Sequence, residues 1–304
     1  MNTASNTSPT NAAPLDSADR KPLWQTTLAG GLLLLALVWT YAAALGELWN
    51  RWSTDAAYGH GFFVPFVALF FLWHRRELIS LPFQGSWWGL VGIAVAVALK
   101  LVSHYWYYTL LDPLSIVPMT AGLCLFLLGW KGLRWCWPAC AFLVFMVPLP
   151  GRLADLLSQP LQRIATTVST YLVQLAGIPA VAEGNVIVLT NARIGVIEAC
   201  NGLRMLILFF AVATAVALLI NRPIWFRCLL LASAVPVALV ANIIRITATA
   251  MAHEYGSAAL ADHIFHGVAA WLMMPLGILL LCLELAFLDH AFPEREKQRP
   301  ISLA

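Results

Sequence analysis

The stretch EACNGLRMLILFFAVATAVALLI, residues 198–220, decides the fold class of this chain. The segment Ala199–Ile220 has about the 20 residues that a helix needs to cross the hydrocarbon core of a bilayer, and it is uncharged from Met205 onward. Its start carries a thiol at Cys200 and a guanidinium at Arg204, one helical turn (about 6 Å) deeper on the same face. A charge inside a membrane helix is costly and normally lines a bundle interior, so Arg204 requires a functional explanation.

Apolar stretches of this kind recur along the chain. Of its 304 residues, 61% are hydrophobic and only 11% are charged, which is typical of a protein with many membrane spans. The hydropathy pattern gives eight candidate spans: Leu28–Gly46, Ala56–Trp73, Trp87–His104, Pro113–Trp130, Trp135–Leu149, Ala199–Ile220, Cys228–Ile246 and Ile264–Leu283. The fifth is short, and the seventh can continue through Met251. The sequence therefore predicts an all-α membrane protein, a bundle of about eight transmembrane helices.

The connections between these spans differ in their basic residues, which prefer the cytoplasmic side of a membrane. With the amino terminus inside, the cytoplasmic segments hold eleven basic residues: Arg20, Lys21, Arg75, Arg76, Lys131, Arg134, Arg222, Arg227, Arg295, Lys297 and Arg299. The outer segments hold four: Arg51, Arg152, Arg163 and Arg193. This imbalance predicts that both termini of the membrane protein lie in the cytoplasm. No basic surface suited to nucleic acid is visible.

The two ends of the chain are polar. Residues 1–22 are rich in Ser, Thr, Asn, Asp and Pro, so we expect a disordered cytoplasmic tail. Residues 23–290 then form the transmembrane domain, and residues 291–304 form a second cytoplasmic tail. The first span is longer than the apolar h-region of a typical signal sequence, so we expect it to be retained as an anchor.

The longest stretch between spans, residues 150–198, falls on the outer, periplasmic side. Apolar residues recur at helical spacing in its first part: Leu153, Leu156, Leu157, Leu161, Ile164, Val168, Leu172 and Leu175. Polar residues stand between them, which predicts an amphipathic helix along the outer membrane surface. From Glu183 to Glu198, β-branched residues flank an Asn-Ala turn and predict a short β-like hairpin that leads to Cys200.

The predicted topology brings several reactive side chains to one depth. Cys200 and Arg204 lie at the outer end of span six, whereas Asn242 and Arg245 lie toward the outer end of span seven. Three histidines fall in the next connection or at the start of span eight: His253, His263 and His266. A thiol, two guanidiniums, an amide and an imidazole can therefore meet just under the outer membrane surface.

Each of these residues also has a structural explanation. Membrane cysteines are often small packing residues, and we expect this of the five that lie mid-span or toward the cytoplasm: Cys124, Cys136, Cys140, Cys228 and Cys282. Only Cys200 lies near the outer face, so it has no evident disulfide partner. Arg245 could instead reach the outer headgroups, although its distance from the end of the span weakens this explanation.

The histidines and one further cluster leave alternatives open. His263 and His266 have a spacing that would suit a metal site completed by Asp262 or Glu254. One thiol and scattered carboxylates form no recognised zinc set, however, so we expect neither a metal nor a cofactor. The start of span two carries an outer cluster with an expected structural or substrate-positioning role: Asp55, Tyr58, His60 and Gly61.

A set of Cys, Arg and His residues supports acyl transfer. A cysteine thiolate attacks a peptide carbonyl and forms a thioester, which divides one difficult step into two easier ones. Nearby positive charge lowers the pKa of a thiol and stabilises the developing oxyanion, and arginine suits this task because it stays charged. Histidine titrates near neutral pH, so it can take the proton and return it to the leaving amine.

The sequence resembles the exosortase and archaeosortase family of multipass membrane transpeptidases, from about residue 25 to residue 290. The resemblance rests on these stretches: Glu198-Ala-Cys-Asn-Gly-Leu-Arg204, Asn242-Ile-Ile-Arg245-Ile, Phe265-His266, Gly59-His-Gly-Phe-Phe-Val-Pro65 and Trp73-His-Arg-Arg76. It implies that Cys200 is the nucleophile, Arg245 the catalytic arginine and His266 the catalytic histidine, with His263 as the competing histidine. It implies supporting roles for Arg204, Asn242, Glu198 and His263.

The resemblance also implies the partners. The substrates would be exported proteins with a carboxy-terminal sorting signal, made of a short motif such as Pro-Glu-Pro, a transmembrane helix and a basic cluster. The freed carboxyl would pass to an unknown acceptor, often in cells that make extracellular polysaccharide. Two other classes stay open: a transporter or flippase whose Arg204 and Arg245 line an anion pathway, and a hydrolytic intramembrane protease that uses the same residues.

Overall fold

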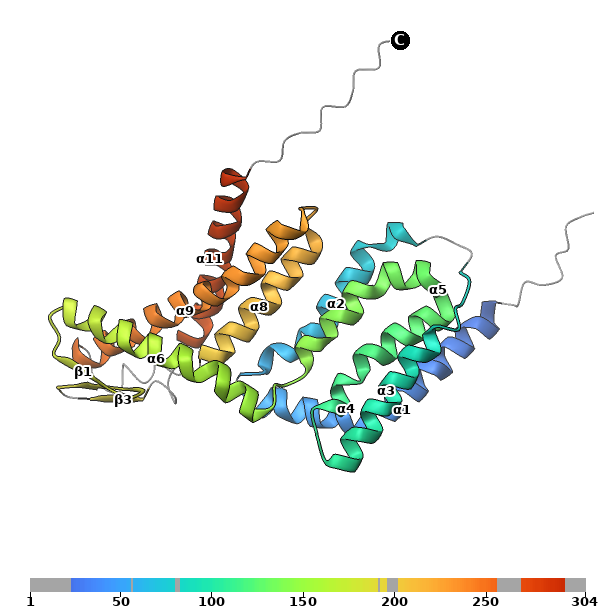
Figure 1. Cartoon of the computed structure of the whole chain (residues 1–304), viewed down its shortest axis with the longest axis horizontal. Coiled ribbons are helices and arrows are strands. Elements are labelled where there is room, and N and C mark those ends of the chain that lie inside the picture. The colour runs from blue at the N-terminus through green and yellow to red at the C-terminus, as the bar shows by residue number, and fades with distance from the viewer. Residues whose placement is uncertain are drawn as a thin grey trace, which may run out of the picture. The chain divides into compact units, whose positions relative to one another are not determined.

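The computed structural model describes residues 23–55, 57–79, 83–190, 192–195, 202–255 and 269–292. The chain divides into two compact units, residues 1–43 and residues 44–304. Helix α1 contains the end of the first unit and the start of the second, and the second unit contains all the other elements (Figure 1).

The elements follow one another in this order: α1 (Leu23–Thr54), η2 (Gly59–Phe62), α2 (Val64–His74), η3 (Arg76–Leu78), α3 (Gly89–Trp106), α4 (Leu111–Leu114), α5 (Ile116–Phe142), η4 (Leu143–Met146), α6 (Gly151–Leu175), β1 (Ala180–Glu183), β2 (Val186–Leu189), β3 (Arg193–Gly195), α8 (Gly202–Leu219), α9 (Ile224–Tyr255) and α11 (Ala269–Ala291). The elements labelled η are short 3₁₀ helices.

Helices dominate the part of the chain that the structure describes, and many are apolar. Within the described residues, four stretches are long and apolar enough to cross a membrane: Gly30–Thr54, Gly89–Trp106, Leu111–Met146 and Ile224–Tyr255. Two shorter apolar helices accompany them: Val64–His74 and Leu203–Leu219. Large apolar side chains stay exposed on these helices, as expected of surfaces that lipid covers. The prediction of an all-α, multi-pass membrane protein is confirmed.

The helix of predicted span two begins later than the hydropathy pattern indicated. A 3₁₀ turn, η2, comes first, and α2 begins at Val64. Pro65 stands in the first turn of α2, where a missing backbone N–H costs no helical hydrogen bond. Tyr58 and His60 therefore lie in the connection that precedes the membrane helix.

Predicted spans four and five form one helical hairpin, α5. Gly129 interrupts this helix with φ 69° and ψ −166°. The sulfur atoms of Cys124 and Cys136 lie within 4.8 Å of each other, whereas a straight helix would hold these residues about 18 Å apart. The two halves of α5 therefore fold back on each other.

Glycines set the distance between α3 and α5. A Cβ atom on Gly89 would lie 2.6 Å from the carbonyl oxygen of Gly122, and one on Gly92 would lie 2.8 Å from the Gly122 Cα atom. Small residues let helix backbones approach closely in a membrane, where van der Waals packing drives helix association. The glycines thus allow α3 and α5 to pack closely. The α3–α4 connection, residues 107–110, follows the far end of α3 and forms one wall of a pocket.

Helix α6 confirms the predicted amphipathic helix, but its leucines do not face the protein. Leu156 is 71% exposed and Leu175 is 85% exposed. The buried face is mostly small and polar: Ser158, Gln162, Ala165, Thr166, Ser169, Thr170 and Val173. This face packs against α8 and α9, and the Ser169 hydroxyl donates a hydrogen bond to the Ile243 carbonyl at 3.3 Å. The apolar face of α6 is left for lipid.

Three short strands after α6 form an antiparallel sheet in the order β1-β2-β3. Strands β2 and β3 confirm the predicted hairpin, whereas the sequence did not indicate β1. Strand β1 pairs with β2 across Gly184-Asn185, and Gly184 has a positive φ of 64°. A glycine at the first central position is the pattern of a type II′ hairpin turn. Ile187 and Ile194 pack the sheet against Ile246 of α9, so the chain leaves β3 beside that helix.

Helices α8, α9 and α11 pack on one another through apolar side chains that include Phe209, Leu230 and Leu281 (Figure 1). Helix α9 runs to Tyr255, which confirms that the seventh apolar stretch continues past Met251. His253 therefore lies in the last turn of α9, and its expected place in the next connection is wrong. Arg245 lies about 15 Å from the end of α9, well inside the helix.

Candidate functional site

Three of the residues expected at the site lie in described helices. Arg204 stands in the first turn of α8, and Asn242 and Arg245 stand one turn apart on α9. The others lie outside the described residues: Glu198, Cys200, His263 and His266. In the sequence, Cys200 is separated from Gly202, the first residue of α8, only by Asn201.

Arg204 and Arg245 come together where α8 packs on α9. Their positively charged guanidinium groups repel each other, whereas the negative charge of Asp55 attracts Arg204. Arg245 is 9% exposed and Arg204 is half-buried. Like charges repel more strongly in a medium of low dielectric than in water. An anion, or a negative charge that develops during a reaction, is therefore stabilised beside these two residues, the arginine pair.

Asn242 is a buried amide next to this pair. It lies one turn before Arg245 on the same face of α9 and is 1% exposed. Its Nδ2 and Oδ1 atoms have no hydrogen-bond partner among the described residues. Such a buried polar group costs about 1–3 kcal/mol. An amide that both donates and accepts suits the backbone of a bound peptide.

The connection between α1 and α2 brings two more polar residues to the arginine pair. Asp55 lies within electrostatic range of Arg204, and its Oδ1 atom accepts a hydrogen bond from the Ala57 backbone N–H at 2.9 Å. The His60 ring is also within electrostatic range of Arg204. Its Nε2 atom donates to the Phe145 carbonyl at 3.2 Å. The structure thus joins part of the outer cluster, Asp55 and His60, to the arginine pair.

His60 is held in its neutral form. Burial lowers the pKa of its imidazole below the ordinary value of 6.5, hydrogen bonds with the backbone of Phe145 and Ala57 oppose this, and the positive charge of Arg204 lowers the pKa further. The adjacent Gly61 packs closely on Trp52. A Cβ atom at this glycine would lie only 2.2 Å from the indole nitrogen, so a larger residue would not fit. The ring of His60 is therefore fixed by its own hydrogen bond and by the packing of its neighbour.

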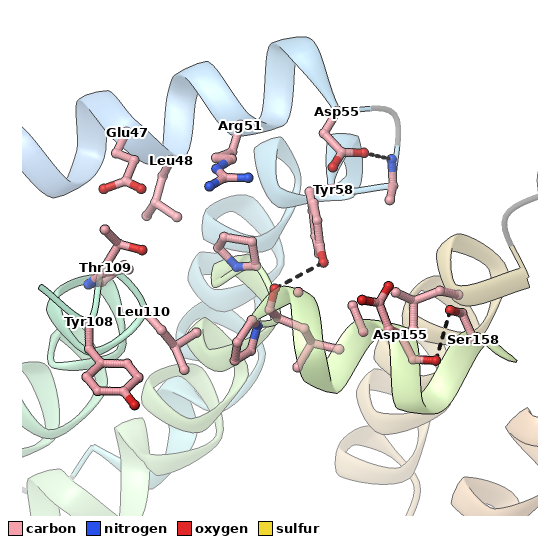
Figure 2. A pocket seen from close by; sticks show the side chains of 18 of the residues that line it. Glu47, Leu48, Arg51, Asp55, Tyr58, Tyr108, Thr109, Leu110, Asp155 and Ser158 are labelled. Carbon is pink, nitrogen blue, oxygen red and sulfur yellow. Dashed lines mark hydrogen bonds between the residues drawn. The ribbon is translucent and has the colours of Figure 1, made fainter. Parts of the chain in front are cut away.

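A pocket of about 450 Å³ lies beside this cluster (Figure 2). Leu203, the neighbour of Arg204 in the chain, lines one side of it. The other lining residues come from the end of α1 and the connection after it, the α3–α4 connection, and the start of α6: Glu47, Leu48, Arg51, Asp55, Ala57, Tyr58, Tyr107, Tyr108, Thr109, Leu110, Pro113, Pro148, Leu149, Pro150, Gly151, Ala154, Asp155, Ser158 and Gln162. Three connections on one face of the bundle thus enclose the pocket.

Tyr58 forms part of the pocket wall in a fixed position. Its hydroxyl donates to the Leu149 carbonyl at 3.5 Å, as Figure 2 shows. Burial raises the pKa of the Tyr58 phenol above its ordinary value of 10.0, and the negative charge of Asp55 adds to the rise. Tyr58 therefore remains a neutral hydrogen-bonding group at physiological pH.

Sequence reasoning missed Glu47 and Asp155 as site residues. The signal for Glu47 is its spacing, because Glu47, Arg51 and Asp55 follow one another at four-residue intervals and share a helix face. Such a charged stripe is unusual at the end of a membrane helix. The signal for Asp155 is weaker, since it stands among other polar residues of α6.

One group of described side chains is arranged so that it could hold a metal ion: Cys124, Cys136 and Cys140, whose Sγ atoms lie within 4.8 Å of one another. Cys136 and Cys140 are buried inside the α5 hairpin, as expected of packing residues. Cys228 and Cys282 are exposed, so the packing prediction is wrong for these two. The alternative metal site at His263 and His266 falls outside the described residues.

Comparison with known proteins identifies the family. A family model described as transmembrane exosortase matches residues 49–283, a range that contains every residue expected at the site. Searches of curated protein sequences and of solved structures found no significant match. Since the family model covers most of the chain, this protein belongs to the transmembrane exosortase family.

Proposed function

We propose that the protein is a membrane-embedded cysteine peptidase and transpeptidase that removes the carboxy-terminal sorting signal of exported proteins. Family membership supports a membrane transpeptidase in general. In this proposal Cys200 is the nucleophile, Arg245 the catalytic arginine and His266 the catalytic histidine. The observation that carries it is the meeting of Arg204 and Arg245 at the start of α8, the helix that follows Cys200 in the chain.

The position of the thiol in the chain suits its activation. A helix N-terminus and nearby guanidinium groups both favour a thiolate over a thiol. Only Asn201 separates Cys200 from Gly202, the first residue of α8, and Arg204 stands in the first turn of that helix. The same charges oppose a buried cation, so they favour a reaction in which negative charge develops.

The reaction then proceeds in two balanced halves. His266 takes the thiol proton, and the Cys200 sulfur forms a bond to the scissile carbonyl carbon while Arg245 stabilises the oxyanion. The C–N bond breaks, the leaving amine takes the proton from His266, and a thioester remains. A second nucleophile attacks this thioester and releases the sulfur, so a transfer to an acceptor or a hydrolysis completes the cycle.

The remaining residues support these steps. Arg204 adds positive charge beside Arg245, and the buried amide of Asn242 holds the peptide backbone of the substrate. The Nδ2 and Oδ1 atoms of Asn242 have no partner among the described residues, which supports this role. Glu198 and His263, next to the proposed catalytic residues in the sequence, orient them, and His263 is the alternative catalytic histidine.

The fold suits a substrate that is itself anchored in the membrane. A sorting signal carries its own transmembrane helix, which docks sideways among the spans and leaves the motif at the outer surface. The exposed leucines on α6 support a site at that surface, because they anchor this helix in the lipid interface. With both termini in the cytoplasm of an inner-membrane protein, the site faces the periplasm and the basic cluster of the substrate stays inside. The acceptor is then an outer-face molecule of a cell that makes extracellular polysaccharide.

The direct test is Cys200→Ala and Cys200→Ser in cells that express a candidate sorting-signal protein. We expect both variants to stay in the membrane and to leave the substrate at its full size on a gel. Cys282→Ala is the matched control, because Cys282 is an exposed cysteine on a different helix, and it should process normally. Undiminished processing by Cys200→Ala would remove this thiol as the nucleophile and turn attention to the metal and transport hypotheses.

A further inference from the structure

The pocket lined by Glu47 and Asp155 has a chemical character opposite to that of the arginine pair. Among the described residues, three carboxylates line it, from Glu47, Asp55 and Asp155, against one guanidinium, from Arg51. Figure 2 shows the Glu47, Arg51 and Asp55 side chains extending from the end of α1 and Asp155 on the facing helix α6. Tyrosine, threonine, serine and glutamine side chains add further polar groups to the lining. The pocket therefore favours a cation with hydrogen-bonding groups.

This pocket and the arginine pair are neighbours. Leu203 lines the pocket, and the next residue, Arg204, belongs to the pair. Asp55 also lines the pocket, and its charge acts on Arg204. A molecule bound among the carboxylates would thus lie next to the start of α8, the helix that follows Cys200 in the sequence.

We propose that this pocket binds the acceptor of the transfer reaction and that the acceptor carries a primary amine. This inference rests on the proposed function. The two substrates of an acyl transfer must occupy adjacent sites at once, and here two adjacent sites differ in charge. The arginine pair stabilises the oxyanion of the acyl donor, whereas the acidic pocket attracts the ammonium group of the acceptor. A volume of about 450 Å³ admits a small headgroup or a side chain that bears the amine.

The chemistry balances without an oxidant or a reductant. The bound ammonium group gives one proton to a pocket carboxylate, and the nitrogen lone pair then attacks the thioester carbonyl on Cys200. A C–N bond forms, the C–S bond breaks, and the sulfur leaves with the bonding electron pair. The second proton of the amine passes to His266 and then to the thiolate. The products are an amide, the free thiol and one released proton.

The experiment uses the purified full-length protein, a tagged peptide that carries a sorting signal, and biotinylated pentylamine as the acceptor. The measured quantity is the ratio of the biotinylated amide to the free acid. Asp155→Asn and Glu47→Gln each remove one negative charge without changing the side-chain shape, and two variants are used so that a folding defect in one does not decide the test. Glu77→Gln is the matched control, since Glu77 lies in η3, outside the pocket.

We expect wild type and Glu77→Gln to form the amide and the two pocket variants to lower the amide-to-acid ratio at least tenfold, with a raised KM for the amine. Amide formation that Asp155→Asn and Glu47→Gln leave unchanged would overturn this inference and leave the proposed function intact. The same holds if wild type cleaves the peptide but gives only the free acid, even at saturating amine. Absence of all cleavage, in wild type as in Cys200→Ala, would overturn the proposed function and the inference with it.

Discussion

The guanidinium groups of Arg204 and Arg245 act on each other across the contact between α8 and α9. Arg204 stands in the first turn of its helix and Arg245 lies well inside its own. Two adjacent like charges destabilise a fold, and proteins accept such local costs mainly at functional sites. We therefore expect the arginine pair to stabilise an anionic group, such as the oxyanion of the proposed reaction.

The first prediction concerns the identity of Arg245. Arg245→Lys keeps the charge but loses the planar set of donors, and removal of one oxyanion donor slows catalysis by about 100-fold to 1000-fold. We expect a loss of this size in the rate of sorting-signal cleavage. Arg222→Lys is the control, because Arg222 pairs with Asp289 at 2.8 Å near the other end of α8. Full activity in Arg245→Lys would show that only the charge matters.

The second prediction separates function from stability at Asn242. Asn242→Leu replaces a buried amide without described partners by an apolar group of similar size. We expect the free energy of unfolding to rise by about 1–3 kcal/mol, because the cost of burying an amide without partners is removed. The variant should therefore unfold at a higher temperature, but it should cleave the sorting signal more slowly. Thermal unfolding in detergent and a cleavage assay measure the two effects. A lower unfolding temperature would mean that the amide has a structural partner within the protein.

The third prediction concerns pH. The pKa of His60 is lowered in the folded protein, so between this value and about 6.5 the unfolded chain binds more protons than the folded one. The contribution of His60 to the free energy of unfolding is therefore complete above about pH 6.5 and is lost as the pH falls below this value. His60→Gln retains an N–H donor for the Phe145 carbonyl but does not titrate. Thermal unfolding at pH 7 and pH 5 should show a smaller loss in His60→Gln than in wild type; equal losses would contradict the buried, neutral state of this ring.

The fourth prediction concerns the hairpin turn of α5. Gly129→Ala places a Cβ atom 1.9 Å from the Gln84 carbonyl oxygen at a residue with φ 69°. With ψ −166° as well, this backbone conformation lies in a region that essentially only glycine adopts and costs other residues about 1–3 kcal/mol, so we expect a clearly lower unfolding temperature. Gly46→Ala is the matched control, because a Cβ atom there meets nothing within 4 Å, and alanine favours a helix by about 1 kcal/mol. Equal behaviour of the two variants would contradict the tight turn at Gly129.

The sequence predicts the membrane class, α6 and the β2–β3 hairpin because each leaves a periodic pattern. It misses β1, since Ala180 to Glu183 lacks alternation and only the Gly184-Asn185 turn reveals the pairing. It also places the start of α2 too early, because hydropathy does not distinguish a 3₁₀ turn from an α-helix. The hydrophobic pattern of the sequence therefore does not predict elements that depend on backbone geometry rather than on burial.

The candidate site shows the same division. Arg204, Asn242 and Arg245 are visible in the sequence because polar residues in apolar stretches are costly. The contribution of Asp55 and His60 depends on how the α1–α2 connection folds against α8, and no local pattern encodes that contact. Glu47 and Asp155 face one pocket from elements far apart in the chain, so only the tertiary structure brings them together.

The most direct test of the central claim is to trap the acyl-enzyme. The purified protein is mixed with a sorting-signal peptide, quenched in acid within one turnover, digested and analysed by mass spectrometry. The account predicts that the amino-terminal part of the peptide is attached to the fragment that contains Cys200 and that neutral hydroxylamine releases it. A peptide that is cleaved without any adduct on Cys200, or with an adduct on another residue, would contradict the account.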